Sequence, residues 1–211
     1  MNPAFENLNA EKKTNIIRAC LEEFAQNGYE RASTNSMVSR AGISKGLLFH
    51  YFGSKKDLYL YLLDYAIEHF IGRFYDNDVK ASSDLFERIM KRGIVKMKIA
   101  SEQPFMYKLV MEAFMDTPGG MEEEMKARYD KIYSQHMPAV FEDIDFSLFR
   151  EDIDKQKAME FMLLSFDGIY NRYMKQAKEK ALDLSLEEVD KIVSEYYIFI
   201  DMIKYGIYKK N

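Results

Sequence analysis

Hydrophobic positions near the start of the chain recur with the period of an α-helix. Over residues 11–26 apolar side chains fall three or four positions apart, so they line one face of a helix. The pair Asn27-Gly28 follows directly, and glycine after such a segment is a typical helix end. The pattern therefore predicts a first helix over about residues 11–26.

Two shorter apolar segments follow, and a serine that can cap a helix precedes each of them. Ser33 comes before a helix expected at about 34–40. Ser44 comes before a second helix, expected at about 45–51. Gly42 ends the first helix and lies in the tight turn between the two. Two short helices separated by a glycine-containing turn are the helix-turn-helix arrangement.

Longer helices are predicted for the rest of the chain. Ser54-Lys55-Lys56-Asp57 is typical of a capping box, and it opens a helix that runs to about residue 75. Further helices are expected at about 83–101, 104–115, 119–136, 151–180 and 186–208, with residues 137–149 irregular. Thr117 is expected to cap the third of these. Because no segment alternates with the period of a strand, we predict an all-α fold of about nine helices.

The composition is that of a soluble, folded protein built from long elements. Hydrophobic residues make up 47% and charged residues 30% of the 211 positions, with only four Pro and ten Gly. Neither a signal peptide nor an apolar run of membrane-spanning length is apparent. The single cysteine, Cys20, fits a reducing cytoplasm, and its apolar neighbours predict a buried structural thiol.

Charge is distributed unevenly along a chain that is acidic as a whole. Residues 1–60 carry eight Lys or Arg and six Asp or Glu, a balance of +2, whereas the whole chain carries −4. The remainder therefore carries −6, and the more basic start is suited to approach phosphate groups. We predict a three-helix head over residues 1–58 and a helical body over residues 59–211.

The segment 28–58 contains the motifs on which a family resemblance rests. It has Ala-Gly-Ile-Ser-Lys-Gly at 41–46, Leu-Phe-His-Tyr-Phe at 48–52 and Gly-Ser-Lys-Lys-Asp-Leu at 53–58. With these motifs the sequence resembles the TetR family of transcriptional regulators over about residues 11–60. Beyond that range the resemblance is one of helical architecture. It implies a head that binds double-stranded DNA and a body that binds a small molecule and forms a homodimer.

The resemblance implies DNA contacts from a set of residues on and around the second short helix. These are Ser33, Thr34, Asn35, Ser44, Lys45, Gly46, Leu47, Phe49, His50, Tyr51 and Lys55. Ser33 and Thr34 are placed as phosphate contacts, because helix N-termini present free N–H groups to anions. Lys45 lies at the opening of the recognition helix, where base preference is set. Tyr51 would donate its hydroxyl to a phosphate and Lys55 would clamp another.

The sequence departs from the family's usual pattern in four places. Residues 36–38 read Ser-Met-Val where an acidic residue followed by Ile-Ala is usual. Ala32 replaces a common threonine, and Phe49 replaces a common tyrosine, so its hydroxyl is missing. Leu47 replaces a threonine or another small residue and is suited to contact a thymine methyl. The operator sequence is therefore not implied by the resemblance.

The body is rich in Met, Phe and Tyr, and the resemblance implies that some of these side chains line a ligand pocket. The candidates are Tyr65, Phe70, Met97, Tyr107, Met111, Phe114, Tyr133, Phe166 and Tyr170. Ordinary core packing is the alternative for each of them. Methionine-rich walls suit an apolar, flexible effector such as a fatty-acyl or aromatic compound, whereas Glu112 or Asp167 in the wall would suit a cation.

The last two predicted helices carry broad apolar stripes. The resemblance implies that they pair with the same helices of a second copy in a four-helix bundle. The expected interface residues are Phe161, Ser165, Gly168, Tyr196, Ile200, Ile203 and Ile207. The alternative is that these stripes cover the body of their own chain.

Taken together, the sequence predicts a cytoplasmic, ligand-responsive regulator, a repressor released from a palindromic operator by a small molecule. The alternatives are an all-α enzyme and a protein-interaction module without DNA binding. No Glu stands three residues before His50, His69 or His136, so the pairs of a carboxylate-bridged metal oxidase are lacking. No nucleophile elbow, P-loop or dinucleotide fingerprint occurs either. We therefore expect neither an enzyme nor a cofactor or metal.

Overall fold

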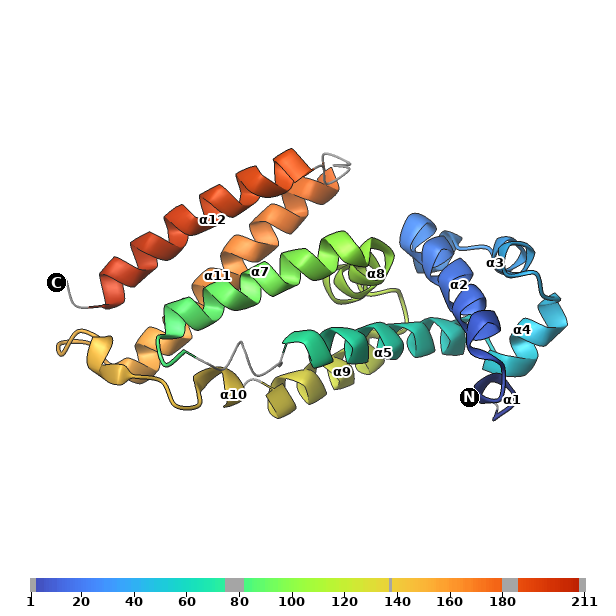
Figure 1. The fold of residues 1–211 in the computed structure, drawn as a ribbon, viewed down its shortest axis with the longest axis horizontal. Coiled ribbons are helices and arrows are strands. Elements are labelled where there is room, and N and C mark those ends of the chain that lie inside the picture. Colours follow the sequence, from blue (N-terminus) through green and yellow to red (C-terminus); the bar gives the residue numbers. More distant parts are fainter. Residues whose placement is uncertain (1–2, 75–81, 137, 180–185, 209–211) are drawn as a thin grey trace. The chain divides into compact units, whose positions relative to one another are not determined.

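The structure, a computed structural model, describes residues 3–74, 82–136, 138–179 and 186–208, in which helices are joined by short turns and loops (Figure 1). The elements are α1 (Pro3–Glu6), α2 (Ala10–Arg31), α3 (Thr34–Ala41), α4 (Lys45–Phe52), α5 (Lys55–Phe74), α7 (Leu85–Glu102), α8 (Pro104–Met115), α9 (Glu122–His136), α10 (Pro138–Phe141), the 3₁₀ helix η1 (Phe146–Leu148), α11 (Lys155–Glu179) and α12 (Leu186–Ile207). No β-strand occurs within the described ranges, so the predicted all-α fold is confirmed. None of the described helices has both the length and the apolar character of a membrane span.

The chain divides into two compact packing units. The first comprises Met1–Ala81 and Ile89–Glu142, and the second comprises Ser82–Arg88 and Asp143–Asn211. These limits do not coincide with the predicted boundary after residue 58, because side chains on both sides of that boundary share one core. The assignment of DNA binding to residues 1–58 and of ligand binding and dimerisation to residues 59–211 stays a prediction.

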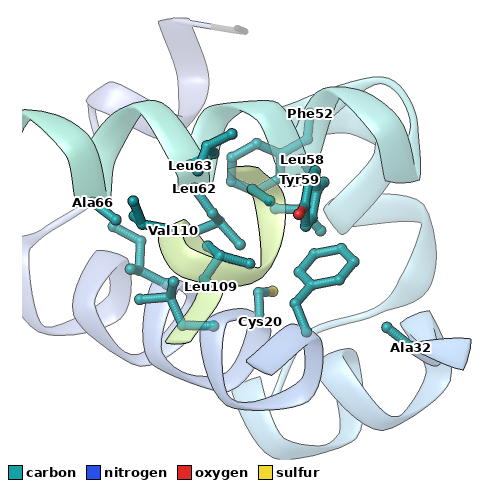
Figure 2. Close-up of a cluster of buried hydrophobic side chains, with 14 of the residues drawn as sticks. Cys20, Ala32, Phe52, Leu58, Tyr59, Leu62, Leu63, Ala66, Leu109 and Val110 are labelled. Carbon is teal, nitrogen blue, oxygen red and sulfur yellow. The ribbon is translucent and has the colours of Figure 1, made fainter. Parts of the chain in front are cut away.

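The core of the first unit lies between α2, α5 and α8 (Figure 2). Cys20 of α2, Leu62 of α5 and Leu109 of α8 are almost completely buried in it. Burying a side chain such as Leu62 contributes about 1.5–3 kcal/mol, so this cluster is a major source of stability for the unit. The predicted burial of Cys20 is confirmed, and that burial, with a smaller effect of Glu23, raises the pKa of the thiol to about 12.

The short helices of the first unit lie where the sequence predicts them. α3 and α4 agree with the predicted bounds to within one residue. Gly42 follows α3 with φ 66° and ψ 34°, a left-handed conformation that favours glycine. The predicted stop at Gly28 is a kink with φ 69°, after which α2 continues to Arg31.

The start of α5 confirms the predicted helix start and its Ser54 cap, but not the second half of the capping box, because the Ser54 N–H donates to the Phe52 carbonyl. The Asp57 N–H donates to Ser54 Oγ at 3.1 Å, and Ser54 Oγ donates to Asp57 Oδ2 at 2.6 Å. The predicted cap at Thr117 is wrong, because its hydroxyl donates to the Ala113 carbonyl at the end of α8, and α9 begins only at Glu122. The predicted irregular range 137–149 contains α10 and η1.

The second unit is built from α11, α12, η1 and the start of α7. The Tyr208 ring packs at 4.9 Å from Phe86 and 5.2 Å from Phe149, and its hydroxyl donates to Asp84 at 3.0 Å. Met162 of α11 is fully buried. This cluster joins segments that are more than 120 residues apart in sequence.

Candidate nucleic-acid interface

The N-terminal end of α4 is the most exposed part of the helix-turn-helix. Ser44 caps it by accepting a hydrogen bond from the Leu47 N–H at 3.2 Å. Leu48 and Phe52 point into the core with 1% and 5% of their surface exposed, whereas Lys45 and its neighbours on either side are exposed. The helix therefore presents its opening turn to solvent, as the sequence predicts.

Gly46 and Lys45 have the properties expected of residues that contact a binding partner. A Cβ atom placed on Gly46 would meet no heavy atom within 4 Å, so the chain itself does not require glycine there. Glycine inside a helix costs about 1 kcal/mol relative to alanine. Among the described residues, no carboxylate forms an ion pair with Lys45, whose charge faces solvent.

The second turn of α4 is less exposed than predicted. Leu47 and Phe49 are half-buried and His50 is exposed, but Tyr51 is buried, with 5% of its surface exposed. The cause is α1, which the sequence analysis did not predict. Phe5 of α1 is fully buried and packs against the Tyr51 ring in an edge-to-face contact at 5.5 Å. The expected placement of Tyr51 on the open face is therefore wrong.

The predicted phosphate contacts at the start of α3 lie at the surface. Ser33 and Asn35 are exposed and Thr34 is half-buried. Ser33 Oγ caps α3 by accepting the Ser36 N–H at 3.4 Å. The N–H groups of Thr34 and Asn35, for which no described residue is an acceptor, therefore remain for an anion.

A buried carboxylate that the sequence analysis missed holds this helix end in place. Glu23 of α2 is only 3% exposed, and its Oε1 accepts the Ser33 N–H and the Asn27 amide, each at 3.0 Å. Its Oε2 accepts the Ser36 hydroxyl at 2.7 Å. Burial alone would raise the pKa of Glu23, but these hydrogen bonds and the nearby Arg40 charge outweigh it and hold the pKa below its usual value.

The sequence contains a signal that could have identified Glu23 as a buried carboxylate. It follows Cys20 by three positions and Ile16 by seven, so it falls in the middle of the apolar face of α2. A charged residue at such a position is rarely buried without partners. The partners themselves depend on how α2 and α3 cross, which the pattern does not specify.

Lys55, the predicted phosphate clamp, is held by its own chain. Its Nζ donates to the Glu30 carbonyl at 3.1 Å and lies 5.0 Å from the centre of the Tyr29 ring. These contacts fix the ammonium group near the start of α5. Its role in DNA binding stays a prediction.

The described members of the predicted ligand pocket fall into two groups. Phe70 is buried, and Tyr107, Met111 and Phe114 pack partly buried against the core of the first unit. Tyr65 and Tyr133 are exposed at the surface. The side chains of Met97, Phe166 and Tyr170 lie outside the described residues. Their role as pocket residues stays a prediction.

Two cavities occur elsewhere, and none of those candidates lines them. One, of about 620 Å³, lies in the second unit between α11 and α12 and includes Phe161, Met202 and Ile203. The other, of about 530 Å³, lies beside α4 and α5 and includes His50 and Asp64. Among the described residues, no three His, Cys, Asp or Glu side chains gather in a way that would hold a metal ion.

The predicted dimer residues divide between two faces. Phe161 and Gly168 are exposed and Ser165 and Ile203 are half-buried, but Ile200 and Ile207 are buried inside their own unit. The Tyr196 side chain lies outside the described residues. Further exposed apolar residues, which the sequence analysis missed, are Leu164, Tyr197, Ile198, Met202 and Tyr205. The spacing of Ile198, Met202 and Tyr205 by four and three positions places them on one face of α12.

Comparison with known proteins identifies relatives of the N-terminal segment. Residues 16–62 match the model of the family described as bacterial regulatory proteins, tetR family. The fatty acid metabolism regulator protein of Bacillus subtilis (strain 168) is 30% identical over 78 residues, which are 37% of this chain and 40% of that protein. The match thus spans less than half the length of this relative.

Solved structures match the chain over most of its length. A TetR family transcriptional regulator from Chloroflexus aurantiacus J-10-FL has a TM-score of 0.65 and 24% identity and covers 99% of each chain. The transcriptional regulator FadR from Bacillus subtilis, solved in complex with stearoyl-CoA, has a TM-score of 0.61 and 16% identity, over 92% of this chain and 99% of that one. At these identities the likeness shows a shared fold.

Proposed function

We propose that this chain, whose residues 16–62 match the model of the bacterial regulatory proteins, tetR family, is a ligand-responsive, DNA-binding transcriptional regulator of the cytoplasm. The observation that carries the proposal is the opening turn of α4. It combines an exposed serine cap, a lysine that pairs with no carboxylate of the described residues, and a glycine that the chain's own packing does not require. Such a turn is suited to enter a major groove.

The neighbouring features support a phosphate-binding rim around that turn. The exposed start of α3 offers backbone N–H groups to an anion, and Lys55 holds a charge at the start of α5. Phosphate contacts fix the register of a protein on the duplex, while base contacts set its specificity. Lys45 and Leu47 are therefore proposed to read bases, and Ser33, Thr34 and Lys55 to contact the backbone.

The exposed apolar face of α11 and α12 supports a homodimer. Leu164, Met202 and Tyr205 each expose more than 60% of their surface, an arrangement that a second copy would cover. A two-fold dimer presents two recognition helices, so its operator is expected to be a near-palindrome. Half-sites about 34–36 Å apart, one helical turn of DNA, fit such a pair.

For the effector we propose a fatty-acyl compound bound in the helical body. The relative from Bacillus subtilis is described as a fatty acid metabolism regulator, and a protein of the same fold was solved with stearoyl-CoA. Flexible methionine and aromatic walls suit a long apolar chain. Binding would favour a dimer whose recognition helices no longer fit the operator, which releases repression.

Selection of bound duplexes from a random pool tests this function. We expect enrichment of near-palindromic sequences, with an affinity that falls as the salt concentration rises. Stearoyl-CoA, added at increasing concentration, is expected to release the selected duplex. Absence of any enriched sequence would contradict the DNA-binding assignment, and unchanged binding in the presence of stearoyl-CoA would contradict the assignment of the effector.

A further inference from the structure

We infer that Glu23 is a positioning residue of the proposed DNA-binding surface, because from α2 it supplies the carboxylate that a capping box would place on α3 itself. The inference rests on the proposed function. It concerns residue 36, the third residue of α3, where a capping box has a Glu or Gln and this chain has serine. The acid that is missing from α3 is present, thirteen positions earlier, on the helix that packs against it.

The geometry of the capping box gives the reason. In that motif the N-cap side chain accepts the N–H of the third helical residue, whose own acidic side chain accepts the N-cap N–H in return. In α3 the N-cap is Ser33 and the third residue is Ser36. Ser33 Oγ performs the first half by accepting the Ser36 N–H. A serine hydroxyl at 36 does not perform the second half here, because it donates to Glu23.

Glu23 completes the motif from outside the helix. One of its oxygens accepts the Ser33 N–H at 3.0 Å, which is the bond that the usual acid would make. The other accepts the Ser36 hydroxyl at 2.7 Å. The Ser33 N–H and the Ser36 hydroxyl, both at the start of α3, therefore donate to one carboxylate. The acid that holds the start of α3 therefore comes from α2, and not from a residue of α3 itself.

The charges around Glu23 are balanced by α3. Arg40 Nη2 lies 3.6 Å from Glu23 Oε2, and Arg40 Nη1 lies 3.8 Å from Glu22 Oε2. Asn27 donates to Glu23 from the same helix, and the neutral thiol of Cys20 lies one turn before it. A carboxylate that is 97% buried keeps its charge only with such partners, so its hydrogen bonds are strong and directional.

The consequence is a direct link between one buried side chain and the proposed phosphate contacts. Ser33, Thr34 and Asn35 form the end of α3 that Glu23 holds. Binding surfaces need their groups held to within about 0.5 Å of the productive geometry. Loss of Glu23 is therefore expected to loosen this end of α3 and weaken DNA binding while α4 stays intact.

A swap of the carboxylate between the two helices tests the inference. Glu23→Leu removes the tie, and Glu23→Leu combined with Ser36→Glu returns an acid to the usual position. We expect the single variant to bind the selected duplex about tenfold more weakly, the loss that corresponds to one charge-assisted hydrogen bond. The double variant is expected to recover most of that affinity. Glu22→Gln, a neighbour whose carboxylate lies 3.8 Å from Arg40 Nη1, is the matched control and is expected to bind like the wild type.

Amide hydrogen exchange of the full-length protein separates the inference from the proposed function. The Ser33 amide is expected to be protected in the wild type and in the double variant, and to exchange faster in Glu23→Leu. If Glu23→Leu does not fold, Glu23→Met, which has a similar length and no oxygen acceptor, is measured in its place, with the same loss of protection expected at Ser33. A wild type that binds no duplex would overturn the proposed function alone. Unchanged affinity and protection in a folded Glu23 variant, or no recovery in a folded double variant, would overturn the inference.

Discussion

The start of the first unit and the last two helices are both helical, but their sequences determine them in different ways. α3 and α4 each begin at a serine whose side chain accepts a backbone N–H, and each ends at a glycine. α11 and α12 instead carry apolar side chains on a buried face and on an exposed face. Capping residues specify at which residues a helix begins and ends. An apolar stripe specifies that one face of the helix packs against a partner, but it does not specify which partner.

The largest expected effect concerns the exposed face of α12. Met202 is 66% exposed, and a second copy would bury it. Met202→Glu would place a charge in that interface in both copies, so the dimer dissociation constant is expected to rise about 100-fold or more. Sedimentation velocity over a range of protein concentrations measures this. Glu160→Gln, an exposed substitution on α11, is the control, and an undiminished Met202→Glu dimer would refute the proposed interface.

The opposite face of the same helix is expected to affect folding and not association. Ile207 is 4% exposed inside the second unit. In the Met202→Glu background, which isolates the monomer, Ile207→Ala is expected to lower the free energy of unfolding by about 2–5 kcal/mol. Urea denaturation followed by circular dichroism measures the loss. Tyr205→Ser, on the exposed face, is expected to change it by less than about 0.5 kcal/mol, and equal losses would contradict the assignment of the two faces.

In the helix-turn-helix the expected effects are on binding. Lys45→Ala removes an exposed charge from the opening turn of α4 without touching the core. If Lys45 also neutralises a phosphate, the slope of log affinity against log salt is expected to fall by about 0.9, with an affinity loss of about tenfold. Fluorescence anisotropy at several salt concentrations measures both. Lys126→Ala on α9, where the lysine is paired with Asp130, is the control and should leave the slope unchanged.

The smallest expected effect is a dependence of stability on pH. The pKa of Glu23 lies below 4.5 in the folded protein, so the unfolded chain takes up its proton first as the pH falls. Its contribution is therefore fully present above about pH 4.5 and is lost as the pH falls through the lower, folded value. Urea midpoints of the wild type and Glu23→Gln are expected to converge as the pH falls below about 4.5. A constant difference would show that the charge of Glu23 does not matter.

The same contrast explains how much of the molecule was predictable from sequence. Ser33, Gly42 and Ser44 act through neighbours within a few positions, so their helices were predicted to within a residue. Tyr51 was misplaced because Phe5 covers it from a helix of four residues, too short to show a period. Glu23 was missed because its partners lie ten and thirteen positions away on another helix.

For the proposed dimer face, periodicity pointed to a stripe of α12 of which Ile200 and Ile207 are buried inside their own unit. Ile200 and Ile207 form the more apolar stripe, and that stripe packs inside its own unit. Ile198 and Met202 form a second stripe, separated from the first by roughly half a turn. Which of two stripes faces inward depends on the helix that packs against them, and a single sequence does not contain that information.

The length of α5 has a consequence for how an effector would act at a distance. The helix runs from Lys55, one of the proposed phosphate contacts, to Phe74, with Leu62 and Leu63 fully buried midway. At 1.5 Å per residue its 20 residues form a rigid rod about 30 Å long, so a tilt of about 5° moves one end by roughly 2.6 Å. An effector bound near Phe70 would need to tilt α5 by only a few degrees to move Lys55 away from a DNA backbone. In this protein a single helix, α5, would convert a small displacement at the effector into a larger displacement of Lys55.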